Sequence, residues 1–222
     1  MREKLEKRIA AFFDLDLTVT DRDSLRYFLK NQYLDNPQKW PMIPYVVFWG
    51  IMRKLRIISL RTFKEKALVL LRGYSVSDIE EVGKNFLENY LIYSIRKNAI
   101  GSVRWHNKKG HFTYIISASP DIYISSITNY LGCNGYDCTK LFFQNNKFTG
   151  ELDGSDCLGI EKIKRIRAIS IKENLDLAKS YAYSDHESDL PFLGIVGYPV
   201  AVSPTVKLRK ISADRGWRVE EW

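Results

Sequence analysis

Short, continuous apolar runs occur near the start of the chain and again through its second half. Residues 8–13 form the first run, which ends on acidic residues, and residues 111–116, 181–184 and 199–202 form three more. Such a run is typical of a parallel strand that is buried on both faces. Helical stretches separate the later runs, so the pattern predicts an α/β fold with a parallel central sheet.

Residues between the first two predicted strands follow a different pattern. Apolar residues recur there at intervals of three and four, most clearly in residues 60–71. That period is the period of an amphipathic helix. The sequence therefore predicts a core made of residues 1–20 and 98–222, with residues 21–97 inserted as an all-helical unit.

A small β-hairpin is predicted at residues 141–152, where apolar runs flank the pair Asn145-Asn146. A tight turn of this kind joins two antiparallel strands. We expect this hairpin to project from the core.

The composition fits a folded protein without disulfides. The chain has 222 residues, 45% of them hydrophobic and 13% aromatic, which is enough to bury a substantial core. Its three cysteines, an odd number without metal-type spacing, argue against a disulfide framework and a zinc site. The charged segment 1–8 lacks the features of a signal peptide, so a cytoplasmic protein is expected.

The formal net charge of +8 is unevenly distributed. Residues 21–97 contain 14 Lys and Arg against 8 Asp and Glu. Such an excess is compatible with an anionic small molecule, an anionic membrane or nucleic acid. No RNA-recognition signature or regular basic helix accompanies it, so no nucleic-acid partner is expected.

Two carboxylates, Asp14 and Asp16, directly follow the first predicted strand. Their spacing suits a division of labour in which Asp14 is a nucleophile and Asp16 serves leaving group and water as acid and base. Acidic residues also occur routinely at strand ends, so the pair alone is weak evidence.

Hydroxyl groups mark the end of the second predicted strand, in Ile116-Ser117-Ala118-Ser119-Pro120. We expect a helix to begin there, with Ser119 as its cap and Pro120 at its first position. The Ser117 hydroxyl and free backbone N–H groups, including that of Ala118, would then bind phosphate oxygens. A plain helix cap by Ser119 is the simpler interpretation.

Lys162 is predicted to lie in the first turn of a helix that follows Gly159. A cation is unfavourable at that end of the helix dipole unless an anion lies nearby, so Lys162 is a candidate phosphate ligand. Lys164, Arg165 and Arg167 follow closely, which also fits a solvated basic face.

Asp185 and Asp189 follow the strand predicted at residues 181–184. Magnesium prefers hard oxygen ligands and needs few protein carboxylates. Asp14, Asp185 and one backbone carbonyl, with Asp189 in support, would suffice. A transition-metal site around His186 is the alternative, but the other two histidines lie far back in the sequence.

Together these four segments resemble the motifs of the haloacid-dehalogenase (HAD) superfamily, and within it the phosphoserine-phosphatase-like subfamily IB hydrolases. The matching segments are Phe12-Phe13-Asp14-Leu15-Asp16-Leu17-Thr18, Ile116-Ser117-Ala118-Ser119-Pro120, Gly159-Ile160-Glu161-Lys162 and Tyr183-Ser184-Asp185-His186-Glu187-Ser188-Asp189-Leu190-Pro191. The resemblance spans nearly the whole chain. It implies a Rossmann-like core with a helical cap of the C1 type, here residues 21–97, that closes over the active site.

The resemblance also implies a Mg²⁺-dependent phosphatase that forms an aspartyl phosphate on Asp14. The implied metal ligands are Asp14, Asp185 and the backbone carbonyl of Asp16. The implied phosphate ligands are Ser117, Ala118 and Lys162, with Thr18 and Asp189 in support.

The sequence departs from the family pattern at Leu17, where glycine is usual, and at His186-Glu187-Ser188, where Ser-x-Asn is usual. Leu17 places a side chain where a glycine lets the backbone turn freely, and both changes bear on the rate of turnover.

For the substrate, the resemblance implies a cap pocket with an acidic residue for the amine of phosphoserine and an arginine for its carboxylate. Asp23 matches the acidic position, whereas Glu65 stands where the arginine is expected. The prediction is therefore a small, phosphoserine-like phosphomonoester without strict phosphoserine specificity.

Residues 40–52 are aromatic and apolar, and Arg53-Lys54-Leu55-Arg56 follow them. The stretch is too short to span a bilayer. One interpretation is a peripheral contact with an anionic membrane that admits a lipid-linked phosphomonoester. The other is a buried cap helix or a dimer contact, so the chain is expected to be a monomer or a homodimer.

Two further function classes use the same fold. One is a phosphotransferase with an acceptor other than water, and the other is a non-catalytic binding module. All candidate catalytic groups are present, which favours an enzyme over a binding module.

Overall fold

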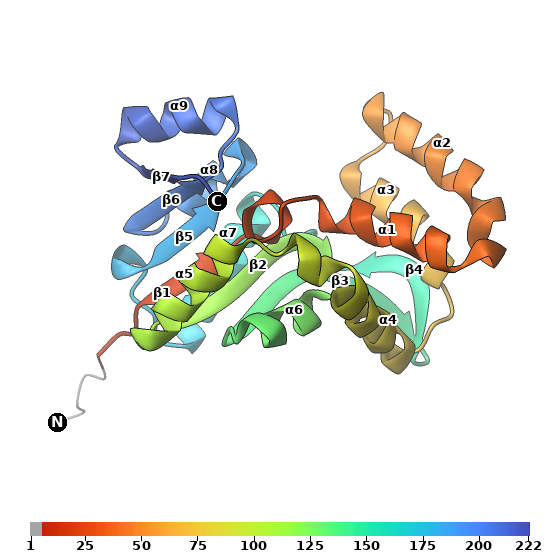
Figure 1. Ribbon diagram of the computed structural model, residues 1–222, viewed down its shortest axis with the longest axis horizontal. Helices are drawn as coiled ribbons and strands as arrows, with labels where there is room; N and C mark the ends of the chain where they lie inside the picture. Colours follow the sequence, from red (N-terminus) through yellow and green to blue (C-terminus); the bar gives the residue numbers. More distant parts are fainter. Residues whose placement is uncertain (1–5) are drawn as a thin grey trace.

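One mixed sheet organises the protein. The computed structural model describes residues 6–222, so the first residues of the charged N-terminal segment lie outside the described part. The strands run in the order β4-β3-β2-β1-β5-β6-β7 (Figure 1), and every neighbouring pair is parallel except β3 and β4. They are β1 (Ala10–Phe13), β2 (Phe112–Pro120), β3 (Gly135–Gln144), β4 (Lys147–Asp153), β5 (Tyr181–Ser184), β6 (Tyr198–Val202) and β7 (Arg218–Glu220). The predicted α/β class with a parallel central sheet is confirmed.

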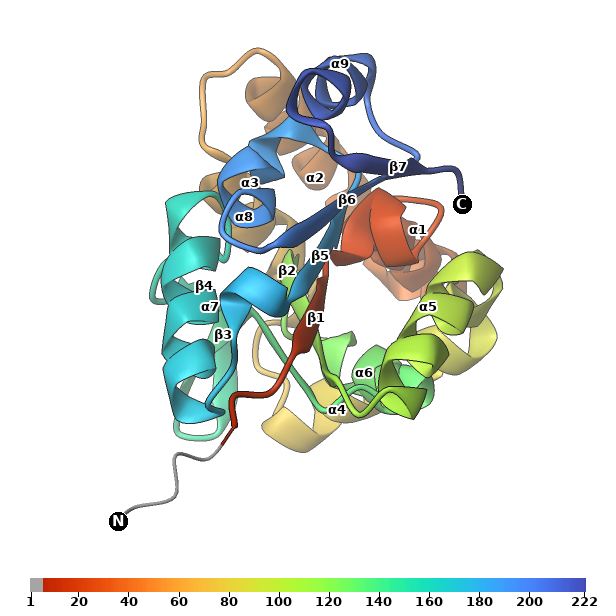
Figure 2. The ribbon, with the colours of Figure 1, turned by 90° about the vertical axis from the view of Figure 1, so that its left-hand side faces the viewer.

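Helices cover both faces of the sheet, and Figure 2 shows α7 and α5 on opposite sides of it. The helices of the core are α5 (Lys97–Lys108), α6 (Ile124–Leu131), α7 (Ile160–Lys172), α8 (Leu190–Leu193) and α9 (Val206–Arg215), with short turns η5 (Leu177–Lys179) and η6 (Glu187–Asp189). Ala10 and Phe12 pack on the side of α7, whereas Ala11 and Phe13 pack on the side of α5. This alternation, with both faces buried, explains why the strand is apolar at every position.

The chain between β1 and β2 is helical, as predicted. Its elements are η1 (Leu15–Val19), α1 (Ser24–Asp35), η2 (Pro37–Met42), α2 (Ile43–Lys54), α3 (Leu60–Ala67), η3 (Leu68–Leu71), α4 (Val76–Asn89) and η4 (Leu91–Ser94). In Figure 1, α1, α2 and α3 lie together near the β4 edge of the sheet, and α4 lies beside α6. None of the helices in residues 6–222 is both long and apolar enough to cross a bilayer.

The predicted hairpin forms, and its residues extend beyond the part of β3 that pairs with β2. Asn145 and Asn146 adopt left-handed backbone angles, with φ of 49° and 58°, and they join β3 to β4. The first half of β3 pairs with β2 as far as Thr139, and its second half pairs with β4 from Lys140 onward, so the hairpin continues the sheet past the end of β2 with β4 as its edge strand. The side chain of Arg61 in α3 donates one hydrogen bond to the backbone oxygen of Leu152 and another to that of Gly154, which helps to cover that edge.

Gly83 is the position at which α4 approaches the core most closely. A methyl group on Gly83 would lie 1.9 Å from the backbone oxygen of Ile122, which cannot move aside as a side chain can. We expect Gly83→Ala to lower the free energy of unfolding by about 2 kcal/mol, measured by urea denaturation. Gly101→Ala is the matched control, because no atom lies within 4 Å of the added methyl in α5. That change should raise the stability by about 0.5–1 kcal/mol, and similar effects of the two substitutions would contradict this docking of α4.

Candidate active site

The acidic residues predicted to act together meet at one edge of the sheet. Asp14 directly follows β1 and Asp185 directly follows β5, and these two strands are parallel neighbours. Their carboxyl ends therefore lie side by side, which is where α/β sheets usually bind ligands. A cavity of about 170 Å³ opens there, and its lining residues are Asp14, Asp16, Leu17, Ala118, Leu158, Lys162, Asp185, His186, Ser188 and Asp189.

Lys162 lies between two carboxylates at the base of this cavity. Its Nζ is 2.8 Å from Asp14 Oδ1 and 2.8 Å from Asp189 Oδ2, and the residue is only 1% exposed. Burial favours the neutral amine, but the two carboxylates outweigh it and raise the pKa of Lys162. As predicted, the lysine occupies the first turn of α7, where these anions offset its unfavourable position against the helix dipole.

Burial strongly affects the carboxylate of Asp14. Desolvation raises its pKa to about 8, and Lys162 opposes that rise. Its backbone N–H donates to the oxygen of Tyr183 in β5, which fixes the residue at the strand end. Asp14 is thus a positioned, poorly hydrated carboxylate beside a fixed cation.

Asp16 is held by three hydrogen bonds that the sequence did not reveal. The backbone N–H of Ser24 donates to Asp16 Oδ1 at 2.6 Å, and the Ser24 hydroxyl donates to the same atom at 2.5 Å. The Ser119 hydroxyl donates to Oδ2 at 2.6 Å. Burial raises the pKa of Asp16, although these bonds counteract it. Ser24 is the first residue of α1, and only the fold brings it to Asp16.

The helix expected to start at Ser119 is absent, which corrects the prediction for this segment. β2 continues through an irregularity to Pro120, which pairs with Thr139 of β3, and the next helix, α6, begins at Ile124. Ser119 therefore does not cap a helix, because its hydroxyl is bonded to Asp16 instead. Any backbone contact with phosphate from this segment would therefore come from the end of β2, where Ala118 lines the cavity, and not from the start of a helix.

Ser117 and Ala118 lie at the expected strand end in different environments. Ser117 is fully buried, and its Oγ accepts a hydrogen bond from the backbone N–H of Ser119 at 3.0 Å. Ala118 lines the cavity. Its backbone oxygen accepts a hydrogen bond from the buried side chain of Lys64 in α3 at 2.7 Å, a link between helical segment and core that the sequence did not indicate.

The acidic residues after β5 provide oxygen atoms suitable for a hard cation. Burial raises the pKa of Asp185 to about 6, and the Thr18 hydroxyl donates to its Oδ1 at 3.2 Å. Asp189 accepts bonds from Lys162 and Ser184 through Oδ2, while its buried Oδ1 has no hydrogen-bond partner among the described residues. A divalent cation, or a water bound to one, would stabilise these buried acceptors.

Residues 6–222 contain no cluster of three His, Cys, Asp or Glu side chains arranged to hold a metal. The site predicted from the sequence needs only the carboxylates of Asp14 and Asp185, with a backbone carbonyl as third ligand. Oxygen ligands of this kind fit Mg²⁺, which retains several waters. The residues present are therefore compatible with that ion.

Asp23 and Glu65, which the resemblance relates to the substrate pocket, lie outside the candidate cavity. Asp23 caps α1 by accepting from the backbone N–H of Arg26, and it also forms an ion pair with Arg26. Glu65 forms an ion pair with Arg61 and accepts from the backbone N–H of Leu152. Asp23 lines a separate cavity between α1, α2 and α3, whereas Glu65 joins α3 to the hairpin.

The backbone of Leu17 adopts a strained conformation in the turn that follows Asp16. Its φ is 59°, in the left-handed region that disfavours a branched side chain. We expect Leu17→Gly to leave the free energy of unfolding unchanged or to raise it by up to about 1 kcal/mol. Leu17→Val should lower it by about 1–2 kcal/mol, because a β-branched residue tolerates this conformation least. Thermal denaturation of both variants tests the assignment, and a larger loss for glycine than for valine would contradict it.

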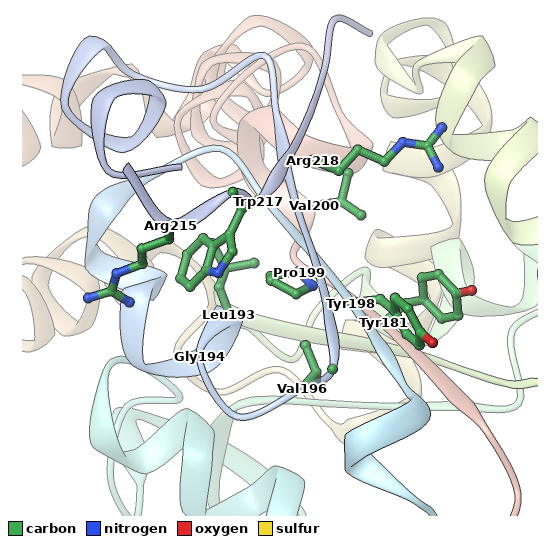
Figure 3. A pocket seen from close by; sticks show the side chains of 12 residues that line it. Tyr181, Leu193, Gly194, Val196, Tyr198, Pro199, Val200, Arg215, Trp217 and Arg218 are labelled. Atoms are coloured by element: carbon green, nitrogen blue, oxygen red, sulfur yellow. The ribbon is translucent and has the colours of Figure 1, made fainter. Parts of the chain in front are cut away.

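A larger cavity, of about 510 Å³, lies at the opposite edge of the sheet, beside the starts of β5, β6 and β7 (Figure 3). Its walls are mostly aromatic, apolar and backbone atoms, and no carboxylate lines it. The charged ends of Arg215 and Arg218 point in opposite directions in this view. The smaller cavity is the better candidate because it combines buried carboxylates with a buried lysine, which the larger one lacks.

Comparison with known proteins agrees with this geometry. Residues 11–194 match the model of the haloacid dehalogenase-like hydrolase family. The chain is 27% identical over 217 residues to phosphoserine phosphatase SerB1 of Mycobacterium tuberculosis, covering 96% of this chain and 70% of that protein. It is 28% identical over 217 residues to the histidinol-phosphatase of Neisseria meningitidis, covering 94% and 96%. A solved structure of a protein of unknown function from Bordetella pertussis superimposes with a TM-score of 0.85 at 23% identity, covering 97% and 99%. The chain therefore belongs to the haloacid dehalogenase-like hydrolases and is a phosphatase of the phosphoserine-phosphatase-like type.

Proposed function

We propose that the chain is a Mg²⁺-dependent phosphomonoester hydrolase that works through a phosphorylated Asp14. The observation that carries the proposal is the contact of Lys162 Nζ with Asp14 Oδ1 at 2.8 Å, with both groups at the base of a cavity lined by further carboxylates. A buried lysine beside a carboxylate nucleophile is suited to hold a phosphoryl oxygen close to the attacking atom.

In the first step, a carboxylate oxygen of Asp14 attacks phosphorus as the bond from phosphorus to the substrate alcohol breaks. Asp16 donates a proton to the departing alkoxide. The raised pKa of Asp16 suits this task, since a proton donor must retain its proton until the leaving group accepts it. The three hydrogen bonds from Ser24 and Ser119 fix the direction of that carboxyl.

In the second step, a water molecule attacks the phosphorus of the aspartyl phosphate. Asp16, now ionised, accepts a proton from that water. The bond between phosphorus and the Asp14 oxygen breaks, which releases inorganic phosphate and restores the Asp14 carboxylate. Lys162 and the backbone of Ala118 would bind the phosphoryl oxygens through both steps, together with the Ser117 hydroxyl if it turns toward the cavity.

Magnesium, when bound by Asp14, Asp185 and the backbone carbonyl of Asp16, would neutralise the negative charge that phosphate brings to this acidic edge. Without such a cation, the pKa values of about 8 for Asp14 and about 6 for Asp185 indicate how strongly burial opposes their charged forms. Thr18 and Asp189 would orient these groups through their bonds to Asp185 and Lys162.

Residues 21–97 are proposed to act as a cap that selects the alcohol part of the substrate. A cavity of about 700 Å³ lies between α1, α2 and α3, and its lining residues are Asp23, Leu25, Arg26, Gly50, Arg53, Lys54, Arg56, Leu60 and Phe63. It is adjacent to the catalytic groups, because Ser24 beside Asp23 bonds Asp16 and Lys64 beside Phe63 bonds Ala118. With one acidic and four basic residues, the lining favours a leaving group that carries an anion.

Three phosphomonoesters of graded charge test this specificity. Phosphoserine has both an amine and a carboxylate, 3-phosphoglycerate has the carboxylate without the amine, and histidinol phosphate has the amine without the carboxylate. We expect kcat/KM for 3-phosphoglycerate to exceed that for histidinol phosphate at least about tenfold, because one charge-assisted hydrogen bond accounts for such a factor. Arg53→Gln should reduce this ratio, and a preference for histidinol phosphate would contradict the assignment of the cavity.

A generic aryl phosphate separates the other function classes from hydrolysis. Release of the aryl alcohol together with an equal amount of inorganic phosphate, dependent on Mg²⁺ and abolished by a chelator, is the result expected for a hydrolase. Alcohol release without matching phosphate would indicate transfer to another acceptor. No turnover of any phosphomonoester would indicate a binding module.

A further inference from the structure

The outer face of α2 is apolar, although it faces solvent. Helix α2 contains no buried residue. Val47, Phe48, Ile51 and Leu55 are between 49% and 60% exposed. Their spacing places them on one side of the helix, where they form a continuous apolar stripe. We call this stripe the outer face of α2.

The opposite side of α2 already packs against the rest of the protein. Met42 and Val46 contact the main core cluster, and Gly50 approaches the ring of Phe63 in α3. The ring of Trp49 lies against Lys66, with Nζ 5.3 Å from the ring centroid. Figure 1 shows α2 at the periphery of the molecule, on the far side of α1 and α3 from the sheet. The outer face is therefore not the packing side of an amphipathic helix, so the buried-helix interpretation of this stretch is wrong.

Charge around the outer face points to an anionic partner. Residues 36–64 contain no Asp or Glu and six Lys or Arg. Lys54 and Arg56 are exposed at the C-terminal end of α2 and form no ion pair with any described residue. An apolar strip bordered by free cations is the surface that binds the headgroup region of an anionic bilayer.

A second copy of this chain is a less suitable occupant of the same face. In a two-fold dimer the same patch meets itself. Lys54 and Arg56 of one copy would then approach those of the other, and residues 36–64 offer no acidic residue to pair with them. The like charges that oppose such a dimer favour contact with an anionic lipid surface.

We propose that the outer face of α2 docks this protein on an anionic membrane surface, with Phe48 and Ile51 entering the headgroup layer and Lys54 and Arg56 beside lipid phosphates. The helix has 12 residues, so it lies in the interface and does not cross the bilayer. This docking uses no residue of the catalytic cavity. Lys54 and Arg56 also line the cavity between α1, α2 and α3, whereas Phe48 and Ile51 line neither cavity, so substitution of these two residues tests the docking separately from the proposed reaction.

Co-sedimentation of the full chain with vesicles tests the docking. One set of vesicles is pure phosphatidylcholine, and the other contains phosphatidylglycerol at roughly one third of the lipid. At low salt we expect binding to the anionic vesicles at least tenfold tighter than to the neutral ones, weakening as salt is raised. No sedimentation with anionic vesicles at low salt, or equal binding to both sets, would overturn the proposal.

The double variant Phe48→Ser/Ile51→Ser should weaken binding to anionic vesicles at least tenfold while leaving hydrolysis of a soluble aryl phosphate unchanged. Its matched control is Ile171→Ser/Val206→Ser, which removes two apolar residues that are 83% and 88% exposed on α7 and α9. Equal losses for the two double variants would overturn the assignment to α2. Light scattering measures the oligomeric state of the unmodified chain and of the Phe48→Ser/Ile51→Ser variant. If the unmodified chain is a dimer that does not bind vesicles, and the variant is a monomer, the outer face of α2 joins two copies and the proposal is overturned.

Discussion

Asp14→Asn is expected to reduce the turnover of any phosphomonoester by at least about 10⁴-fold, the scale on which loss of a nucleophile acts in other covalent enzymes. The amide of asparagine cannot form the acyl phosphate, although its size and position match those of aspartate. The steady-state rate of aryl phosphate hydrolysis, compared at equal protein concentration, measures the effect. Retention of the wild-type rate would remove Asp14 from the role of nucleophile.

The stability of Asp14→Asn shows whether its loss of activity comes from the missing nucleophile or from misfolding. Burial opposes the charge of Asp14 and raises its pKa to about 8, so a neutral isostere fits the site without loss of solvation. Lys162 keeps a partner in Asp189, at 2.8 Å. The free energy of unfolding of Asp14→Asn should therefore stay within about 1 kcal/mol of the wild type. Asp153→Asn, at an exposed position at the end of β4, is the matched control and should change neither rate nor stability.

Lys162→Met is expected to combine a large loss of stability with a large loss of activity. The substitution leaves Asp14 and Asp189 close together in the buried base of the cavity without the cation that both contact. Removing one partner of a buried ionic group costs about 3–5 kcal/mol, because the remaining charge is left without compensation. Loss of a phosphate-binding cation should further reduce kcat by about 10²-fold or more in the fraction that folds.

Lys164→Met is the control for that experiment. Lys164 lies one half-turn further along α7, its side chain is 70% exposed, and its ion pair with Glu161 is at the surface. Such a pair contributes at most about 1 kcal/mol. Urea denaturation should show a much larger loss in the free energy of unfolding for Lys162→Met than for Lys164→Met. Equal losses would contradict a buried ionic role for Lys162.

Much of the candidate active site was predictable because its residues directly follow the ends of strands. Apolar runs fixed the ends of β1 and β5, and Asp14 and Asp185 follow them at once. Parallel neighbours bring their carboxyl ends to the same edge of a sheet, so sequence position implies spatial proximity for these residues. Lys162 was predictable for a related reason, since a lysine in the first turn of a helix requires an anion nearby.

The hydrogen bonds that hold Asp16 were not predictable in the same way. Ser24 and Ser119 are 95 positions apart, and their contact depends on how the helical segment returns to the core. A serine followed by proline is a normal signal for a helix start, yet in this protein strand pairing continues to Pro120. Tertiary pairing outweighed the local preference, so Ser119 bonds a side chain instead of capping a helix.

Which side of α2 is exposed to solvent could be established only from the structure. Composition showed an aromatic, apolar stretch with a basic flank, which suits a buried helix as well as an exposed one. Only the packing of Val46 and Trp49 against neighbouring elements shows which side of α2 faces the protein and which side leaves Phe48 and Ile51 in solvent. Periodicity alone could not decide this because both sides of the helix are apolar.

The most direct test of the proposed mechanism is chemical trapping of the phosphorylated enzyme during turnover. The protein is mixed with an aryl phosphate and Mg²⁺, quenched in acid, treated with borohydride and digested, and the peptides are analysed by mass spectrometry. We predict that the modified residue is Asp14. The modified fraction should be larger in Asp16→Asn, because an aryl alcohol can leave as its anion without a proton from Asp16, whereas the variant cannot activate the water that removes the phosphoryl group. Continued hydrolysis with Asp14 never modified, or with the phosphoryl group on a different residue, would contradict the proposed mechanism.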